Sequence, residues 1–332
     1  MTDRWGFTFP LDPLPLAAQR ELVREAEGWG YTDAWTAEAD GADAFVPAAL
    51  ALAWSERMRA GTAIANVFAR GPALTAMSAA TVAEAAPGRF CLGIGASSPA
   101  IVERWNGVPW RQPLARTREV LSFLRAAFAG EKVTNEALGV RGYRLGRRFA
   151  EPPPVFVAAL RRKMLELAGS AADGVIINWL SPEDASKAVG VARGAAQAAG
   201  RDPDALEVVC RIFVLPPADD TVVRFVARRA IAGYLTTPVY GAFHRWLGRG
   251  EALRTMQEAW DAGDRQAATE AVPEQLIEEL FVTGSRRECL DKIDAYCRNG
   301  VTVPVLSFLP MSLDATEQAE RAVAMLRELG RR

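Results

Sequence analysis

The chain has 332 residues and a net charge of −1, and half of its residues are hydrophobic while 24% are charged, as in an ordinary globular protein. The near-zero charge provides no basic field for nucleic acid, and the most apolar run, residues 45–54, is shorter than the roughly 20 residues that span a bilayer. Four scattered cysteines without a C-x-x-C pair, and an N-terminus without a signal-peptide core, predict a reduced, cytoplasmic protein.

Short apolar segments alternate with amphipathic segments along the chain, which predicts strands and helices in turn. The expected strands are residues 5–9, 31–36, 60–65, 89–94, 155–158, 174–178, 206–215 and 301–309. The expected helices are residues 16–30, 45–55, 73–86, 114–128, 161–171, 182–199, most of 219–280, a segment around 289–297, and 316–329.

Eight strand–helix units without a composition shift or linker favour a single (β/α)8 TIM barrel for residues 1–332. The strands are apolar on both faces, as buried parallel strands are. A plain barrel needs about 250 residues. The surplus is assigned to a surface hairpin at about 131–150 and to a helical insertion at about 219–280, between strands seven and eight. The alternative is a two-domain, doubly wound α/β protein.

Residues 61–72 contain the end of the third expected strand and a polar turn that follows it. The apolar strand breaks at Asn66, and a helix led by Pro72 follows. Such a turn places backbone amides and one carboxamide at the carboxyl end of a strand, where barrels and α/β sheets bind their ligands.

Two further strand ends suit a cofactor that carries phosphate. The segment from Gly93 to Ser98 fails the dinucleotide pattern G-x-G-x-x-G because a serine stands at the third glycine, so it is either a tight packing turn or a cofactor loop. The helix expected after strand five begins with Arg161, Arg162 and Lys163. Because the helix dipole disfavours cations there, these residues favour an anionic partner over a solvated basic turn.

Candidate acid–base residues follow the second strand, where Glu38 and Asp40 are either proton donors or solvated loop charges. The only histidine, His244, stands among aromatic residues, which predicts a packing or surface role. One histidine without a cysteine pair argues against a His/Cys metal centre, so no metal is expected. The nucleophile elbow G-x-S-x-G is absent, which argues against an α/β-hydrolase.

Several segments, in order along most of the chain, resemble the luciferase-like monooxygenase superfamily. They are GYTDAW at 30–35, the stretch 61–72, GRFCLGIGAS at 88–97, WNGVPW at 105–110 with PLARTRE at 113–119, and KMLELAG at 163–169 with ADG at 172–174. The resemblance is greatest to the branch of oxidoreductases that use the deazaflavin coenzyme F420, such as methylene-tetrahydromethanopterin reductase.

This resemblance implies a TIM barrel that binds its cofactor across the carboxyl ends of the strands. It also implies a non-prolyl cis peptide bond at Ala63–Ile64 that supports the deazaflavin ring, and a phosphate site at the amides of residues 159–161. The implied cofactor-binding residues are Thr8, Ala63, Ile64, Asn66, Gly95, Ala96, Ser97, Ala159, Leu160, Arg161, Asn178 and Trp179. Relatives that oxidise alcohols or sugar phosphates have His where Ala39 stands and Glu where Ser98 stands, which argues against those substrates here.

The function that follows is hydride transfer from reduced coenzyme F420 to a C=C or C=N bond of a small-molecule substrate. Glu38 is the first choice for the proton donor and Asp40 the second. The alternatives are an FMN-dependent monooxygenase of the same fold and a non-catalytic flavin-binding barrel. The aromatic residues between 234 and 260 predict a cap over the barrel mouth or a homodimer contact, and the alternative for them is packing against the outer helices.

Overall fold

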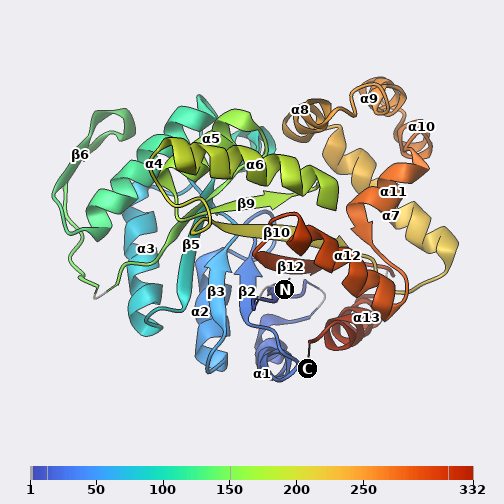
Figure 1. Cartoon of the computed structure of the whole chain (residues 1–332), viewed down its shortest axis with the longest axis horizontal. Coiled ribbons are helices and arrows are strands. Elements are labelled where there is room, and N and C mark those ends of the chain that lie inside the picture. The colour runs from blue at the N-terminus through green and yellow to red at the C-terminus, as the bar shows by residue number, and fades with distance from the viewer. Residues whose placement is uncertain (1–2, 13, 150, 313, 332) are drawn as a thin grey trace.

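The computed structural model describes residues 3–12, 14–149, 151–312 and 314–331, and shows a closed barrel of parallel strands surrounded by helices (Figure 1). β12 pairs with β1, with Gly6 opposite Val305, so the sheet closes on itself. In order around the barrel, the strands are β1 (Gly6–Thr8), β2 (Asp33–Thr36), β3 (Arg59–Thr62) with its continuation β4 (Ala65–Asn66), β5 (Phe90–Gly95), β8 (Val155–Ala158), β9 (Gly174–Asn178), β10 (Glu207–Val214) and β12 (Val303–Phe308). The predicted (β/α)8 TIM barrel is confirmed, and an open, doubly wound sheet is excluded.

The helices cover the outside of the barrel with their apolar faces. They are α1 (Arg20–Gly28), α2 (Phe45–Trp54), α3 (Pro72–Ala85), α4 (Pro113–Phe128), α5 (Arg162–Ala171), α6 (Pro182–Ala198), α12 (Arg286–Arg298) and α13 (Ala315–Glu328). α6 begins with a capping box in which Ser181 and Asp184 each accept a hydrogen bond from the other's backbone N–H. α5 approaches α6 closely at Gly169, where a Cβ atom would lie 1.9 Å from the Ala192 carbonyl oxygen. Within the described residues, no helix has the length and apolarity that a membrane crossing requires.

Large side chains fill the interior of the barrel. Trp35 and Phe156 stack with ring centroids 5.7 Å apart, and Ile176, Val209 and Val305 pack around them. Gly61 makes room for this layer, because a Cβ atom at that position would lie 2.3 Å from the Trp35 ring. These side chains therefore fill the interior of the barrel at this level.

The third strand differs from its expected course. The predicted strand at 60–65 divides into β3 and β4, with the non-prolyl cis bond Ala63–Ile64 between them, as predicted. β4 pairs with the end of β5, with Ala65 opposite Ile94. A second cis bond, Phe9–Pro10, follows β1 and was not predicted.

Two excursions leave the barrel on different sides (Figure 1). The expected hairpin consists of β6 (Val133–Asn135) and β7 (Val140–Tyr143), which pair antiparallel. The longer excursion contains α7 (Asp220–Leu235), α8 (Pro238–Leu247), α9 (Arg254–Asp261), α10 (Arg265–Glu270) and α11 (Glu274–Leu280), and returns through the short strand β11 (Phe281–Val282) beside β10. These helices share a second apolar core with Trp179 and Phe213 from the barrel, so the excursion is packed onto the barrel.

Candidate active site at the carboxyl end of the barrel

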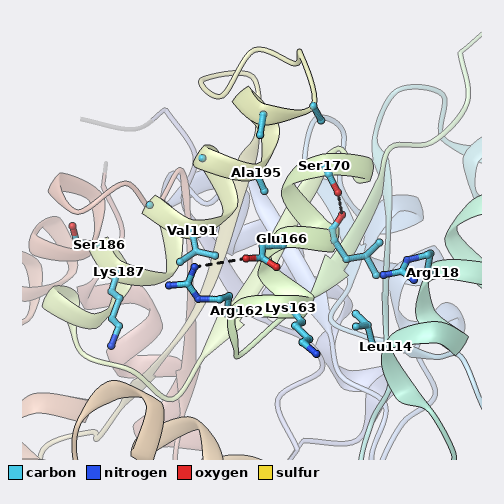
Figure 2. A pocket seen from close by; sticks show the side chains of 15 residues that line it. Leu114, Arg118, Arg162, Lys163, Glu166, Ser170, Ser186, Lys187, Val191 and Ala195 are labelled. Carbon is cyan, nitrogen blue, oxygen red and sulfur yellow. Dashed lines mark hydrogen bonds and ion pairs between the residues drawn. The ribbon is translucent and has the colours of Figure 1, made fainter.

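A narrow cavity lies on the layer of side chains that fills the barrel. It is lined by residues from most sides of the barrel, namely Thr8, Trp35, Thr36, Ala37, Ala63, Ile176, Val209, Arg211 and Val305. A larger and more open groove lies outside the barrel between α5 and α6, and Arg162, Lys163 and Lys187 are among the residues that line it (Figure 2). We place the candidate active site at the barrel mouth, because buried polar groups without partners converge there.

Three side-chain polar atoms at the mouth of the barrel are buried and have no hydrogen-bond partner within the described part of the chain. They are Thr8 Oγ1, Asn66 Nδ2 and Arg211 Nε. An unsatisfied buried donor or acceptor costs about 1–3 kcal/mol, so such atoms are uncommon in a protein interior. Three of them at one end of one barrel fit a site that a polar ligand completes.

Only one end of the Asn66 carboxamide is hydrogen-bonded within the described residues. Asn66 Oδ1 accepts hydrogen bonds from the N–H groups of Phe68 and Ala69, at 2.9 and 3.2 Å. The carboxamide NH₂ is therefore the end that is left free, as a donor. Its place at the ring edge of a cofactor stays a prediction.

Glu38 has a different environment from the one predicted for a proton donor. Its carboxylate accepts hydrogen bonds from Arg70 Nε at 2.8 Å and from the Asn66 N–H at 3.0 Å, and Arg70 Nη2 lies 2.6 Å from it. Because all of these partners donate, we assign Glu38 to holding the Asn66 turn in place. Asp40 is exposed and has no hydrogen bond within the described residues.

The end of β5 turns sharply beside β4. Gly95 is buried, and a Cβ atom there would lie 2.9 Å from Ile64. Ser97 adopts a left-handed φ of 56°, and the Ala96 carbonyl accepts a hydrogen bond from Trp110 Nε1 at 2.9 Å. The predicted residues Ala63, Ile64, Gly95, Ala96 and Ser97 therefore come together around one turn, although the structure does not show a cofactor contact for them.

The predicted phosphate site at α5 requires one correction. The Ala159 N–H donates to the Ile176 carbonyl oxygen at 2.9 Å, as part of the barrel ladder, so it is not available to a phosphate. The N–H groups of Leu160 and Arg161 have no acceptor within the described residues, because they precede the first hydrogen-bonded turn of the helix. Arg161 is exposed and without an ion-pair partner among those residues, whereas Arg162 lies 3.7 Å from Glu166.

The end of β9 is covered by α8. Asn178 Nδ2 donates to the Tyr240 hydroxyl at 3.1 Å, and burial raises the pKa of Tyr240 to about 12. Trp179, with a left-handed φ of 54°, buries its indole against Phe213 at 4.3 Å between ring centroids. The side chain of Trp179 therefore belongs to the second apolar core, and its expected role in binding the cofactor stays a prediction.

His244 is buried in α8, and its Nε2 lies 2.9 Å from the Trp179 carbonyl oxygen. Burial lowers the pKa of His244 to about 4, so the ring is neutral at pH 7 and donates this hydrogen bond. The predicted packing role is confirmed. No group of three His, Cys, Asp or Glu side chains within the described residues lies close enough to hold a metal ion.

Sequence reasoning missed Arg211. It lies within an apolar strand, and only the period of two that it shares with Glu207 and Val209 signals that its side chain points into the barrel.

Comparison with known proteins gives a consistent family. The family model described as luciferase-like monooxygenase matches residues 7–303. A protein of Mycobacterium tuberculosis that is provisionally named a coenzyme F420-dependent oxidoreductase is 27% identical over 86% of this chain and 89% of its own. The 5,10-methylenetetrahydromethanopterin reductase of Methanolobus tindarius is 34% identical over 61% of this chain and 63% of its own.

Among solved structures, the coenzyme F420-dependent tetrahydromethanopterin reductase of Methanopyrus kandleri superposes with a TM-score of 0.78, at 24% identity, over 99% of this chain and 97% of its own. This likeness shows a shared fold over the full barrel. The predicted resemblance, including its F420-dependent branch, is thus confirmed by the relatives that match. On the extent of the family match, the chain belongs to the luciferase-like monooxygenase family.

Proposed function

We propose that this protein is a coenzyme F420-dependent oxidoreductase that reduces a C=C or C=N bond of a small-molecule substrate. The names of its relatives support the choice of cofactor. The observation that carries the proposal is the set of buried, unpartnered polar atoms at the barrel mouth, with free amides at the start of α5 nearby in the ring of strand ends. A ligand with a polar ring and a phosphate would satisfy both.

The residues that would hold the cofactor divide into two groups. Thr8 Oγ1 and Asn66 Nδ2 would meet the polar edge of its ring, and the amides of Leu160 and Arg161 would receive its phosphate. Arg162 and Lys163, both exposed, would meet its acidic tail through weak, salt-sensitive contacts. When bound, reduced F420 supplies the hydride, and the protein supplies position and a proton.

We assign the proton to Asp40 in preference to Glu38. Glu38 anchors the Asn66 turn through Arg70, whereas Asp40 is exposed on the loop after β2. A solvent-exposed carboxylate can exchange its proton with water between turnovers.

Cofactor titration tests the proposal. We expect F420 to bind more tightly than FMN, without oxygen uptake on reduction, and reduced F420 to be oxidised by an unsaturated substrate. Tight FMN binding with oxygen uptake would instead establish an FMN-dependent monooxygenase. F420 binding without turnover on any member of a panel of unsaturated acids, ketones and imines would leave a non-catalytic flavin-binding barrel.

We also propose that the protein forms a homodimer. The residues between 234 and 260 are mostly committed to their own chain, since Phe243 is buried and stacks on Trp246. Large exposed apolar side chains occur at Trp105, on α7 at Val222, Phe225 and Tyr234, and on the neighbouring helices α2 and α3 at Val46, Leu74 and Met77. We assign the dimer contact to the group on α2 and α3. Light scattering of the wild type and of a Leu74→Glu, Met77→Glu double variant would test this, because only a dimer through α2 and α3 is converted to monomer.

A further inference from the structure

Arg211 is a half-buried cation at the barrel mouth. It follows Val209 by two residues on β10, so its side chain points into the barrel, and it lines the cavity together with Thr8 and Ala63. Its Nε is buried and has no hydrogen-bond partner, and no carboxylate within the described residues lies within ion-pair distance of its guanidinium. The ring of Phe213 lies 5.3 Å from Cζ in a contact of cation–π type.

The groups around Arg211 do not neutralise it. Burial lowers its pKa, while the phenols of Tyr234 and Tyr240 and the carboxylate of Asp12 act in the opposite direction from a distance. An arginine remains protonated at neutral pH even so. A charge that has lost part of its water without gaining a partner carries a desolvation cost, and an anionic ligand would offset that cost.

We propose that Arg211 binds a carboxylate of the substrate, so that the enzyme acts on small unsaturated or imine-bearing acids. This inference rests on the proposed function, because it assigns the substrate class of the same site. A planar guanidinium binds a carboxylate through two parallel hydrogen bonds, which fixes the orientation of the ligand as well as its charge. The polar atoms of Thr8 and Asn66 are left for the cofactor, so the two ligands do not compete for donors.

If Arg211 binds a carboxylate, the site should prefer an anionic ligand over a neutral ligand of the same shape, and the experiment measures this preference. Benzoate and benzamide have nearly the same shape and differ in charge, and their dissociation constants are measured by calorimetry with the chain saturated with F420. We expect the wild type to bind benzoate at least about tenfold more tightly than benzamide, as for a shielded, charge-assisted hydrogen bond. Arg211→Met should abolish this preference, Arg211→Lys should keep part of it, and Arg20→Met, which removes an exposed cation from α1, should leave it unchanged.

The melting temperature of Arg211→Met shows whether a loss of binding comes from the site or from unfolding. Removing the half-buried, unpaired charge of Arg211 relieves its desolvation, so Arg211→Met should melt no lower than the wild type. If it does melt lower, Arg211→Lys decides, since it must then retain the benzoate preference. Equal binding of benzoate and benzamide by the wild type, or an unchanged preference in Arg211→Met, would overturn the inference.

Two outcomes distinguish this inference from the proposed function. If Arg211→Met weakens binding of reduced F420 and leaves the benzoate preference intact, Arg211 serves the cofactor and the inference is wrong, while the proposed function stands. If the wild type does not bind F420, the proposed function fails. The benzoate preference of the unloaded chain then decides for or against Arg211 by itself.

Discussion

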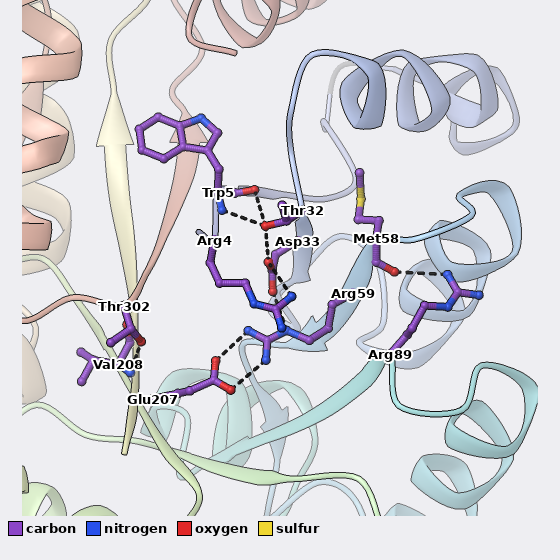
Figure 3. Close-up of polar contacts among 10 residues, drawn as sticks. All are labelled: Arg4, Trp5, Thr32, Asp33, Met58, Arg59, Arg89, Glu207, Val208 and Thr302. Carbon is purple, nitrogen blue, oxygen red and sulfur yellow. Dashed lines mark hydrogen bonds and ion pairs between the residues drawn. The ribbon is translucent and has the colours of Figure 1, made fainter. Parts of the chain in front are cut away.

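Each end of the barrel contains an arginine that projects into the interior, and the two arginines differ in their partners. At the amino end, Arg59 donates from Nε to Asp33 at 2.6 Å and from both Nη atoms to Glu207, at 2.9 and 2.8 Å (Figure 3). At the carboxyl end, Arg211 has no carboxylate partner within the described residues. Both side chains project into the same barrel, and Arg211 and Glu207 lie on the same face of the same strand.

This contrast indicates that the amino end of the barrel serves stability and that the carboxyl end serves ligand binding. The guanidinium of Arg59 is satisfied by two carboxylates, so the amino end is complete without a ligand. The carboxyl end is incomplete, because Thr8, Asn66 and Arg211 each have a polar side-chain atom without a hydrogen-bond partner among the described residues. A TIM barrel places stability at its amino end and chemistry at its carboxyl end, and the pairing of charges shows the same division here.

The strongest test of this contrast removes the amino-end arginine. Arg59→Met leaves Asp33 buried, with only Arg4 at 3.7 Å as a cation, and should lower the free energy of unfolding by about 3–5 kcal/mol. Urea unfolding at pH 7 measures this, with Arg211→Met as the matched carboxyl-end variant, which should cost nothing. A loss below about 1 kcal/mol for Arg59→Met would remove the distinction between the two ends.

Acid should loosen the carboxyl end through His244. Its pKa falls from 6.5 in the unfolded chain to about 4 in the fold, so the unfolded chain takes up the proton first. The stability that this group contributes is complete above about pH 6.5 and is lost as the pH falls to about 4, by about 3 kcal/mol at 1.36 kcal/mol per pKa unit. Urea unfolding at pH 7, 5.5 and 4.5 should show this loss in the wild type relative to His244→Gln, which keeps an N–H donor for Trp179. Parallel pH curves for the two proteins would contradict it.

The start of α5 tests the phosphate assignment. Arg161→Ala should weaken F420 binding by about tenfold, close to 1.4 kcal/mol, because Arg161 is the basic residue beside the two free amides. Raising the salt concentration should weaken the wild type more than a variant with Arg162 and Lys163 both neutralised. Unchanged affinity in Arg161→Ala, together with no salt dependence, would place the phosphate elsewhere.

The smallest expected effect is at Thr8. Its hydroxyl has no partner, so Thr8→Val should leave the free energy of unfolding within about 1 kcal/mol of the wild type. If the hydroxyl meets the cofactor ring, the same change should weaken F420 binding by several-fold, as for a neutral hydrogen bond. Thr62→Val is the matched control, because Thr62 Oγ1 is bonded to both backbone groups of Gly93 and its loss should reduce stability. Equal loss of stability in the two variants would show that the hydroxyl of Thr8 is not spare.

The sequence by itself determined the order and type of the elements. Apolar strands alternating with amphipathic helices predict a parallel barrel, since both periodicities are local and repeat along the chain. The resemblance carried by the segment 61–72 predicted the cis bond at Ala63–Ile64, and the Asn66 turn follows from a strand that meets a polar residue and then Pro72. His244 among aromatic residues was read correctly as a packed side chain.

Only the tertiary structure decided which polar groups are already satisfied. Glu38 and Asp40 are two residues apart in sequence, yet the first is held by Arg70, which is 32 residues away, and the second is free. The Ala159 N–H is hydrogen-bonded to β9, and the Trp179 indole packs against the excursion helices. Both partners come from other parts of the chain. Each polar group can make only a limited number of hydrogen bonds and ion pairs, so its remaining chemistry depends on the groups that folding places against it. For this reason two arginines that look alike in the sequence differ in the structure, where Arg59 has carboxylate partners and Arg211 has none among the described residues.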